Sequence, residues 1–99
     1  MEITEVRVNL QDEEVLKAFV SITLDDEFVV RGLKVIQGME GRFVAMPARK
    51  KRDGTFQDIA HPINHETREY MESVILTEFD RAVAEQEAGP GADGAGGRD

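Results

Sequence analysis

The stretch Leu16-Lys17-Ala18-Phe19-Val20-Ser21-Ile22-Thr23-Leu24 decides the fold class of this 99-residue chain. Five apolar side chains recur on it at every second position: Leu16, Ala18, Val20, Ile22 and Leu24. A period of two residues is typical of a β-strand that turns one side towards a core. A helix over residues 13–19 is the alternative, but the alternation continues too far for a helix. The stretch therefore predicts a half-buried strand.

A further strand is expected on either side of this one. Residues 3–10 alternate in the same way, and the charged residues 11–14 separate the two strands. Residues 25–27 predict a turn into a strand over 28–36, whose faces are both apolar: Val29, Leu33 and Val35 on one, Phe28, Val30 and Ile36 on the other. We therefore expect this strand to be covered on both faces. Gly32 at its centre predicts a β-bulge or a close backbone approach.

Two shorter strands are expected next. Residues 42–46 form the first, which Pro47 ends. After a basic run, Asp53-Gly54 is a strong hairpin signal, because both residues tolerate positive φ. Residues 56–60 are then the returning strand.

The last expected element is a long helix. Pro62 closes the extended segment, and Asn64 is a suitable N-cap whose side chain can accept a hydrogen bond from the amide of Thr67. Six apolar side chains share one helical face: Met71, Val74, Ile75, Phe79, Ala82 and Val83. The polar side chains expected to point away from the core are Glu69, Glu72, Asp80 and Arg81. The helix is expected to end near Glu87.

These elements predict an α+β domain over residues 1–87, with an antiparallel β-meander of about five strands followed by one long C-terminal helix. Residues 88–99 hold five of the nine glycines and are expected to be disordered. One helix covers one sheet face, so the other face, with Phe19 and Phe28 or Val30 among its members, needs a cover. A homodimer formed through the sheet is the expected cover, because a small domain buries too little surface alone.

Composition excludes several classes of protein. No cysteine is present, which excludes disulfides, thiolate nucleophiles and cysteine-bound zinc. No apolar run approaches the roughly 18 residues of a membrane span, and the first residues lack the pattern of a signal peptide. A cytoplasmic protein with no membrane partner is therefore expected.

Charge is distributed unevenly along the chain. The totals of 12 basic and 20 acidic residues give a net charge of −8, which by itself argues against a nucleic-acid partner. Residues 42–68, however, hold six basic and three acidic residues. Because a phosphate responds to charges within a Debye length of about 10 Å, this cationic segment is the best candidate for binding a polyanion.

The run Arg49-Lys50-Lys51-Arg52 is the candidate nucleic-acid-binding site. It leads into the Asp53-Gly54 turn, so the four cations form a finger that can reach a phosphate backbone, with Arg42 and Arg68 as outer contacts. The two arginines of the run can also form paired hydrogen bonds with a guanine edge. The alternative is a solvated surface hairpin whose cations only favour solubility.

No catalytic, cofactor or metal site is predicted. His61 and His65 have the spacing of metal-binding histidines on a helix, but Pro62 lies between them and breaks the helical spacing. We expect His61 to be partly buried at a strand-to-helix corner and His65 to lie on the surface; a metal-dependent enzyme that uses both is the alternative. The candidate nucleophiles are distant from both histidines, so catalysis on a small-molecule substrate is not expected: Ser21, Thr23 and Ser73.

Several blocks of the sequence resemble the SpoVG family, the stage V sporulation G proteins. In order, the blocks are residues 21–25 (SITLD), 27–30 (EFVV), 43–47 (FVAMP), 53–54 (DG) and 58–64 (DIAHPIN). Each block is short, but their order and spacing together are highly specific. The resemblance extends from Met1 to about Val83.

The resemblance implies a small α+β protein that dimerises through its sheet and binds nucleic acid. Members are bacterial regulators that act on DNA, and in some cases RNA, and affect septum formation, sporulation and gene expression; none is known as an enzyme. The basic stretch of the family falls on Arg49 and Lys50. This sequence departs from it at Lys51 and Arg52, where a Thr-Pro pair is frequent, and at Gln57, where an arginine is common, so its sequence preference can differ.

We therefore expect a cytoplasmic homodimer that binds DNA or RNA through the basic finger of each copy and thereby regulates septum formation and gene expression. The alternative hypothesis is a protein-interaction module of the division or transcription machinery, in which the same finger docks on an acidic protein surface. The net charge of −8 favours this alternative.

Overall fold

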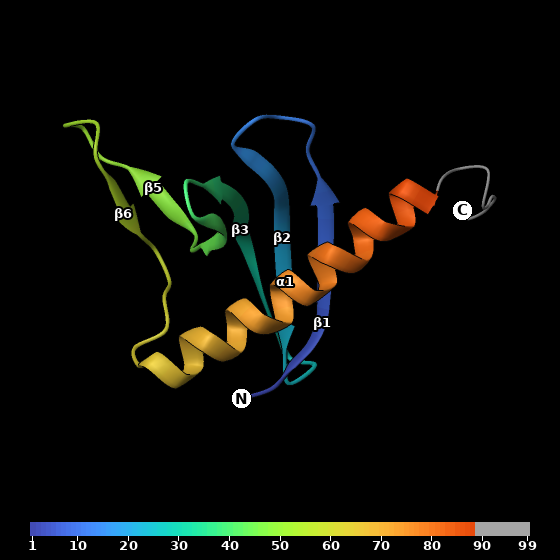
Figure 1. Ribbon diagram of the computed structural model, residues 1–99. Coiled ribbons are helices and arrows are strands. Elements are labelled where there is room, and N and C mark those ends of the chain that lie inside the picture. The colour runs from blue at the N-terminus through green and yellow to red at the C-terminus, as the bar shows by residue number, and fades with distance from the viewer. Residues whose placement is uncertain (89–99) are drawn as a thin grey trace.

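The computed structural model describes residues 1–88, which form four sheet strands, a separate pair of short strands and one helix (Figure 1). The strands are β1 (Ile3–Leu10), β2 (Leu16–Leu24), β3 (Phe28–Gly38), β4 (Gly41–Ala45), β5 (Ala48–Lys50) and β6 (Phe56–Asp58). The helix is α1 (His65–Ala88). The disorder expected for residues 88–99 falls outside the described residues, except that Ala88 is the last residue of α1.

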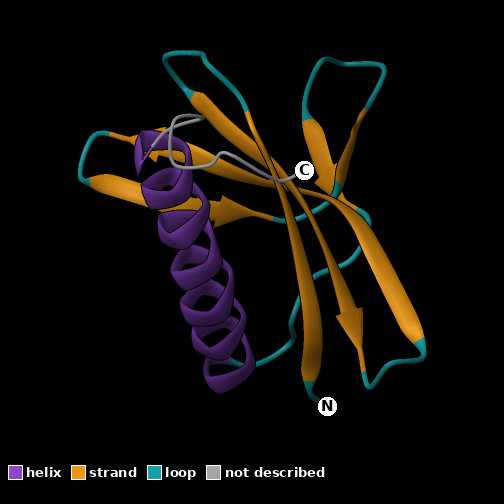
Figure 2. Ribbon diagram, turned by 90° about the vertical axis from the view of Figure 1, so that its right-hand side faces the viewer, coloured by secondary structure: helices purple, strands orange, loops and turns teal. Residues whose placement is uncertain are grey.

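The four-stranded sheet is an antiparallel meander with strand order β1-β2-β3-β4. The helix lies against one side of this sheet (Figure 2), which confirms the predicted α+β architecture. The short strands β5 and β6 pair only with each other. The returning strand is shorter than predicted, because β6 ends at Asp58 rather than at residue 60.

The core lies between α1 and the sheet. Its buried side chains come from every strand of the meander except β1, from the residue after β4 and from the helix: Ala18, Val20, Ile22, Leu33, Val35, Val44, Met46, Met71, Ile75 and Phe79. The apolar side chains of β1 pack against this core and are partly buried. The alternation predicted for β2 is confirmed from Ala18 to Leu24, as is the apolar stripe of α1. At Leu16 it is wrong, because the register shifts between Leu16 and Ala18 and Leu16 pairs with Ile36.

A β-bulge in β3 reverses part of the predicted facing of that strand. Val20 pairs with Leu33, but Ile22 pairs with Val30, so β3 holds one extra residue between these pairs. Because an extra residue inverts the alternation beyond it, Val30 and Phe28 share the helix side with Leu33, and Val29 lies on the opposite side. The predicted faces of these three residues are therefore wrong. Gly32 sits in the bulge with φ of 88°.

The space beside Gly32 would admit a Cβ at ordinary van der Waals distance. A Cβ placed on this glycine would lie 3.4 Å from Cβ of Pro47, the residue that leads out of β4. Of the two alternatives predicted for Gly32, the bulge is therefore the one that the structure confirms.

The start of α1 is fixed as predicted. The amide of Thr67 donates a hydrogen bond of 2.7 Å to Oδ1 of Asn64, which is the N-cap interaction. Nowhere in residues 1–88 does a helix combine the length and apolar character that crossing a membrane requires.

Two polar side chains of α1 reach the outer strands of the sheet. The amide of Ile3 at the start of β1 donates to the Tyr70 hydroxyl at 2.9 Å. The amide of Val44 on β4 donates to Oε2 of Glu72 at 3.5 Å. Glu72 is half-buried, so its predicted orientation away from the core is wrong: a carboxylate on this side of the helix has an unpaired strand amide within reach.

Candidate nucleic-acid interface

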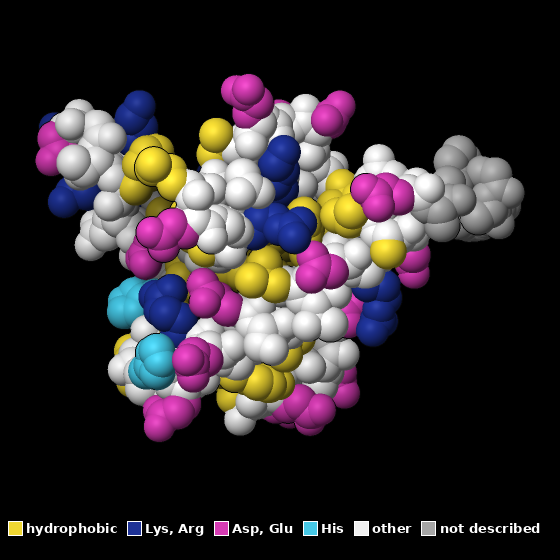
Figure 3. Space-filling view, viewed as in Figure 1, with side chains coloured by type: hydrophobic (Ala, Val, Ile, Leu, Met, Phe, Trp, Pro, Cys, Tyr) yellow, Lys and Arg dark blue, Asp and Glu magenta, His cyan; other side chains and the backbone are white. Residues whose placement is uncertain are grey.

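The basic run lies on a projecting hairpin, here called the arm and defined as residues 48–60. Every residue of the arm is exposed. Within it Arg49 pairs with Gln57, and Lys50 pairs with Phe56. Because paired residues share a face and neighbours alternate, Arg49 and Lys50 point to opposite sides. Figure 3 shows Lys and Arg side chains gathered around the free end of the arm, at the upper left.

The tip of the arm is a tight turn, as the Asp53-Gly54 pair predicts. The amide of Gly54 donates to the carbonyl of Lys51 at 3.0 Å, and the amide of Lys51 donates to the carbonyl of Thr55 at 2.7 Å. Gly54 has φ of 90°, a conformation that glycine adopts without steric cost. The tip therefore holds Lys51 and Arg52 in a defined backbone geometry.

Asp53 is the one carboxylate among the cations of the tip. Its Oδ1 accepts hydrogen bonds from the hydroxyl and the amide of Thr55, at 2.6 and 3.0 Å. The hydroxyl, and then the amide, stabilise the charged carboxylate and lower the pKa of Asp53 below its ordinary value. Asp53 is therefore ionised at neutral pH and opposes an approaching phosphate, while it fixes the turn.

The four cations of the arm are available for a ligand. Within residues 1–88, the ion pairs of the structure involve other side chains, and the arm cations make none of them. The structure thus brings Arg49, Lys50, Lys51 and Arg52 together on one solvent-exposed projection with a single opposing charge at its tip.

The two predicted outer contacts lie on the body instead of the arm. Arg42 on β4 has Nη2 3.6 Å from Oδ1 of Asp80, and its guanidinium carbon lies 5.1 Å from the ring centre of Phe79. The guanidinium of Arg42 thus interacts with an acidic and an aromatic side chain of α1. Arg68 is half-buried and lines the groove between arm and body, beside Glu72.

This groove has a volume of about 450 Å³ and brings aromatic side chains close to the arm. Phe43 of β4 and Phe56 of β6 both line it, and they are 45% and 68% exposed. Sequence reasoning missed these two rings as site residues. The signal for Phe56 was the hairpin register, because the five residues 51–55 between the strands place it opposite Lys50.

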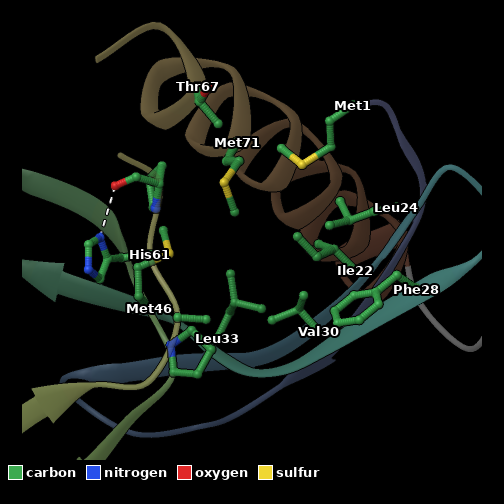
Figure 4. Close-up of a pocket in the computed structure, with 13 residues that line it drawn as sticks. Met1, Ile22, Leu24, Phe28, Val30, Leu33, Met46, His61, Thr67 and Met71 are labelled. Atoms are coloured by element: carbon green, nitrogen blue, oxygen red, sulfur yellow. Dashed lines mark hydrogen bonds between the residues drawn. The ribbon is translucent and has the colours of Figure 1, made fainter. Parts of the chain in front are cut away.

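The two ends of the arm meet over an apolar pocket of about 240 Å³. Met46 and Pro47 line it from one end, and Ala60 and His61 line it from the other. Figure 4 shows Met46, Leu33, Val30 and Phe28 along one side of the pocket, and Met71 and Met1 on the other. The lining of the pocket is mostly apolar, so the residues at both ends of the arm border an apolar hollow of the body.

His61 and His65 do not point towards a common metal position. His61 is exposed, and its predicted partial burial is wrong; its Nδ1 lies 3.0 Å from the carbonyl oxygen of Pro62. His65 lies on the surface as predicted, with Nε2 3.1 Å from Oε2 of Glu69. Residues 1–88 contain no group of three or more His, Cys, Asp or Glu side chains positioned for a metal ion.

Comparisons with known proteins give consistent matches over nearly the whole described chain. A family model described as SpoVG matches residues 1–81. A protein of Anaeromyxobacter sp. (strain Fw109-5), named "Putative septation protein SpoVG", is 66% identical over 83 residues, which cover 84% of this chain and 86% of the relative. Relatives with the same name in Myxococcus xanthus and Thermoanaerobacter sp. (strain X514) are each 56% identical over 89 residues. These two matches cover 90% and 89% of this chain, and 90% and 96% of the relatives.

Proposed function

Since the chain belongs to the SpoVG family, we propose that it is a cytoplasmic, nucleic-acid-binding regulator with a role in septation. The septation role follows from the names of its relatives. The names of these relatives refer to septation and to no catalytic activity. The proposed activity is binding of DNA or RNA, with an influence on septum formation and gene expression.

The observation that carries the nucleic-acid proposal is the charge of the arm. Arg49, Lys50, Lys51 and Arg52 are exposed on a projection, with Asp53 as the only opposing charge at its tip. Local charge of this density attracts a phosphate backbone even when the whole protein is acidic, because carboxylates beyond about 10 Å are screened.

We propose that the protein acts as a homodimer, so that two arms engage one ligand. Along the arm and just after it, three apolar side chains face solvent: Phe56, Ile59 and Ile63, at 68%, 67% and 89% exposure. The three lie within residues 56–63, and exposed apolar side chains of this number in one segment are typical of an interaction surface. Light scattering at micromolar concentration tests this association, and a monomer would reject it.

The test of the activity is a binding series with labelled duplex DNA, single-stranded DNA and RNA of random sequence. Wild type is expected to bind at least one of them, and the variant with serine at positions 49–52 is expected to lose duplex binding and to bind the single strands more weakly at the same salt concentration. Equal binding by both proteins would reject the arm as the site.

A protein-interaction module is the second candidate, and the net charge of −8 favours it. In this hypothesis the arm docks on an acidic surface of a division or transcription protein. Failure to bind all three nucleic acids, together with an arm-dependent complex with one purified division protein, would select this candidate.

A further inference from the structure

The face of the sheet that points away from α1 carries its own set of functional groups. We call it the open face. The strand register places Arg7 opposite Ser21, Asn9 opposite Phe19, and Phe19 opposite Lys34, on the side of the sheet opposite the core residues. Phe43 lies opposite Ile36 on the same face. The open face therefore combines cations, amide and hydroxyl groups, and two phenyl rings.

The charge of the open face is positive although the segment that builds it is acidic. Residues 1–41 hold nine carboxylates, but only Glu5 lies on a strand; the others lie before β1 or in the turns. The four cations of the same segment all lie on strands: Arg7, Lys17, Arg31 and Lys34. Glu5 is paired with Arg7 at 3.0 Å. Negative charge is thus concentrated at the ends of the sheet, and positive charge on its strands.

A shallow hollow on the open face gathers groups of complementary chemistry. It has a volume of about 290 Å³ and is lined by Asn9, Phe19, Ser21, Arg31 and the bulge glycine Gly32. Phe19 is 40% exposed. A phenyl ring offers a surface on which a base can stack, while an amide and a hydroxyl can pair with base edges and a guanidinium can bind phosphate.

The occupant that fits this chemistry is a strand with unpaired bases. In a duplex the base faces are stacked on each other and cannot reach a ring on a flat sheet, whereas a single strand exposes them. A second copy stacked face to face would enclose two Arg31 and two Lys34 side chains in one interface, and like charges gathered in an interface are unfavourable. Charge complementarity thus favours a polyanion.

We propose that the open face is a second binding site, which holds single-stranded nucleic acid by stacking a base on Phe19 and binding the adjacent phosphates with Arg31 and Lys34. Phe43, 45% exposed, provides a further ring on the same face. The site uses residues outside the arm, although Lys34 and Phe43 also line the groove beside it: the arm holds phosphates of any nucleic acid, and the open face selects unpaired strands.

The test measures binding of single-stranded RNA, single-stranded DNA and duplex DNA of one sequence by fluorescence anisotropy. Phe19→Leu keeps an apolar side chain but removes the ring, and is expected to weaken single-strand binding about tenfold, because stacking contributes about 1–3 kcal/mol per base. Duplex binding should change by less than about twofold. The RNA and DNA strands show which sugar the face prefers. Phe28→Leu is the matched control, since Phe28 is 65% exposed but lines the apolar pocket on the helix side.

Arg31→Ala provides a second variant should Phe19→Leu be unstable, and it is expected to weaken single-strand binding without changing the melting temperature. Single-strand binding by Phe19→Leu equal to that of wild type overturns the proposal. So does conversion of a wild-type dimer to a monomer by Phe19→Leu, which would identify the open face as the subunit interface. Wild type that binds duplex DNA but no single strand rejects the open face and leaves the arm proposal standing.

Discussion

Replacement of Arg49, Lys50, Lys51 and Arg52 by serine is expected to remove most of the salt dependence of nucleic-acid binding. Arg49 and Lys50 point to opposite sides of β5, so a backbone lying along one side of the arm meets only one of them. Lys51 and Arg52 at the tip are accessible from either side. Each arm therefore neutralises about three phosphates, and a dimer about six.

The size of the effect follows from counterion release. Each neutralised phosphate of duplex DNA contributes about −0.9 to the slope of log K against log salt, so six contacts give about −5. Between 50 and 200 mM salt, wild type should lose about 10³-fold in affinity. The serine variant should show a slope near zero. Its stability should stay within about 1 kcal/mol of wild type, because the four side chains are exposed and make no ion pair within residues 1–88.

The assay is a salt titration by fluorescence anisotropy, with thermal unfolding measured on the same samples. The serine variant loses four positive charges, which lowers the net charge from −8 to −12. A matched control restores −8 by adding four exposed Glu→Gln changes at Glu13, Glu14, Glu85 and Glu87. If this control recovers wild-type binding, the overall charge governs affinity and the reasoning from the arm is refuted.

The remaining predictions concern the fold and the tip of the arm. Ile75→Ala, which empties a fully buried position, should lower the free energy of unfolding in urea by about 2–5 kcal/mol. Gly32→Ala should cost about 1–3 kcal/mol, because φ of 88° strains an L-residue; an unchanged urea midpoint would contradict the bulge. Asn64→Ala should lower the free energy of unfolding by about 1 kcal/mol. Asn64→Asp should keep the wild-type value, since either polar side chain caps α1. Thr55→Ala should raise the pKa of Asp53 in an NMR titration, because the Thr55 hydroxyl lowers it. Since the folded pKa lies below the unfolded one, this hydrogen bond stabilises the turn at neutral pH, and that contribution is lost as pH falls through the folded pKa.

Local sequence rules predicted the regular elements well. The alternation from Leu16 to Leu24 gave the bounds of β2, and the Asn64 cap gave the start of α1. The Asp53-Gly54 pair gave the turn of the arm. In each case the determining interaction lies within a few residues of the signal, which is why a single sequence contains it.

The errors arise where a distant residue decides the outcome. The side of the sheet on which Val30 lies depends on the position of the bulge, where one residue of β3 has no partner on β2. The alternation of residues within β3 does not show this position. The orientation of Glu72 depends on the amide of Val44, 28 residues away. The positive charge of the open face was missed because charges were counted along the chain. In the folded sheet, the cations of residues 1–41 lie on the strands, whereas most of the carboxylates lie in the turns.

The contacts of Tyr70 and Glu72 with the outer strands have a consequence for biosynthesis. A meander of neighbouring hairpins can pair as it leaves the ribosome, because each strand meets the one made just before it. The helix that occupies the free amides of Ile3 and Val44 is translated last. Until it emerges, both margins of the nascent sheet can recruit strands from other chains. A truncation that stops before residue 65 should therefore accumulate as insoluble, cross-β material, and ribosome pausing before α1 is complete should lower the soluble yield.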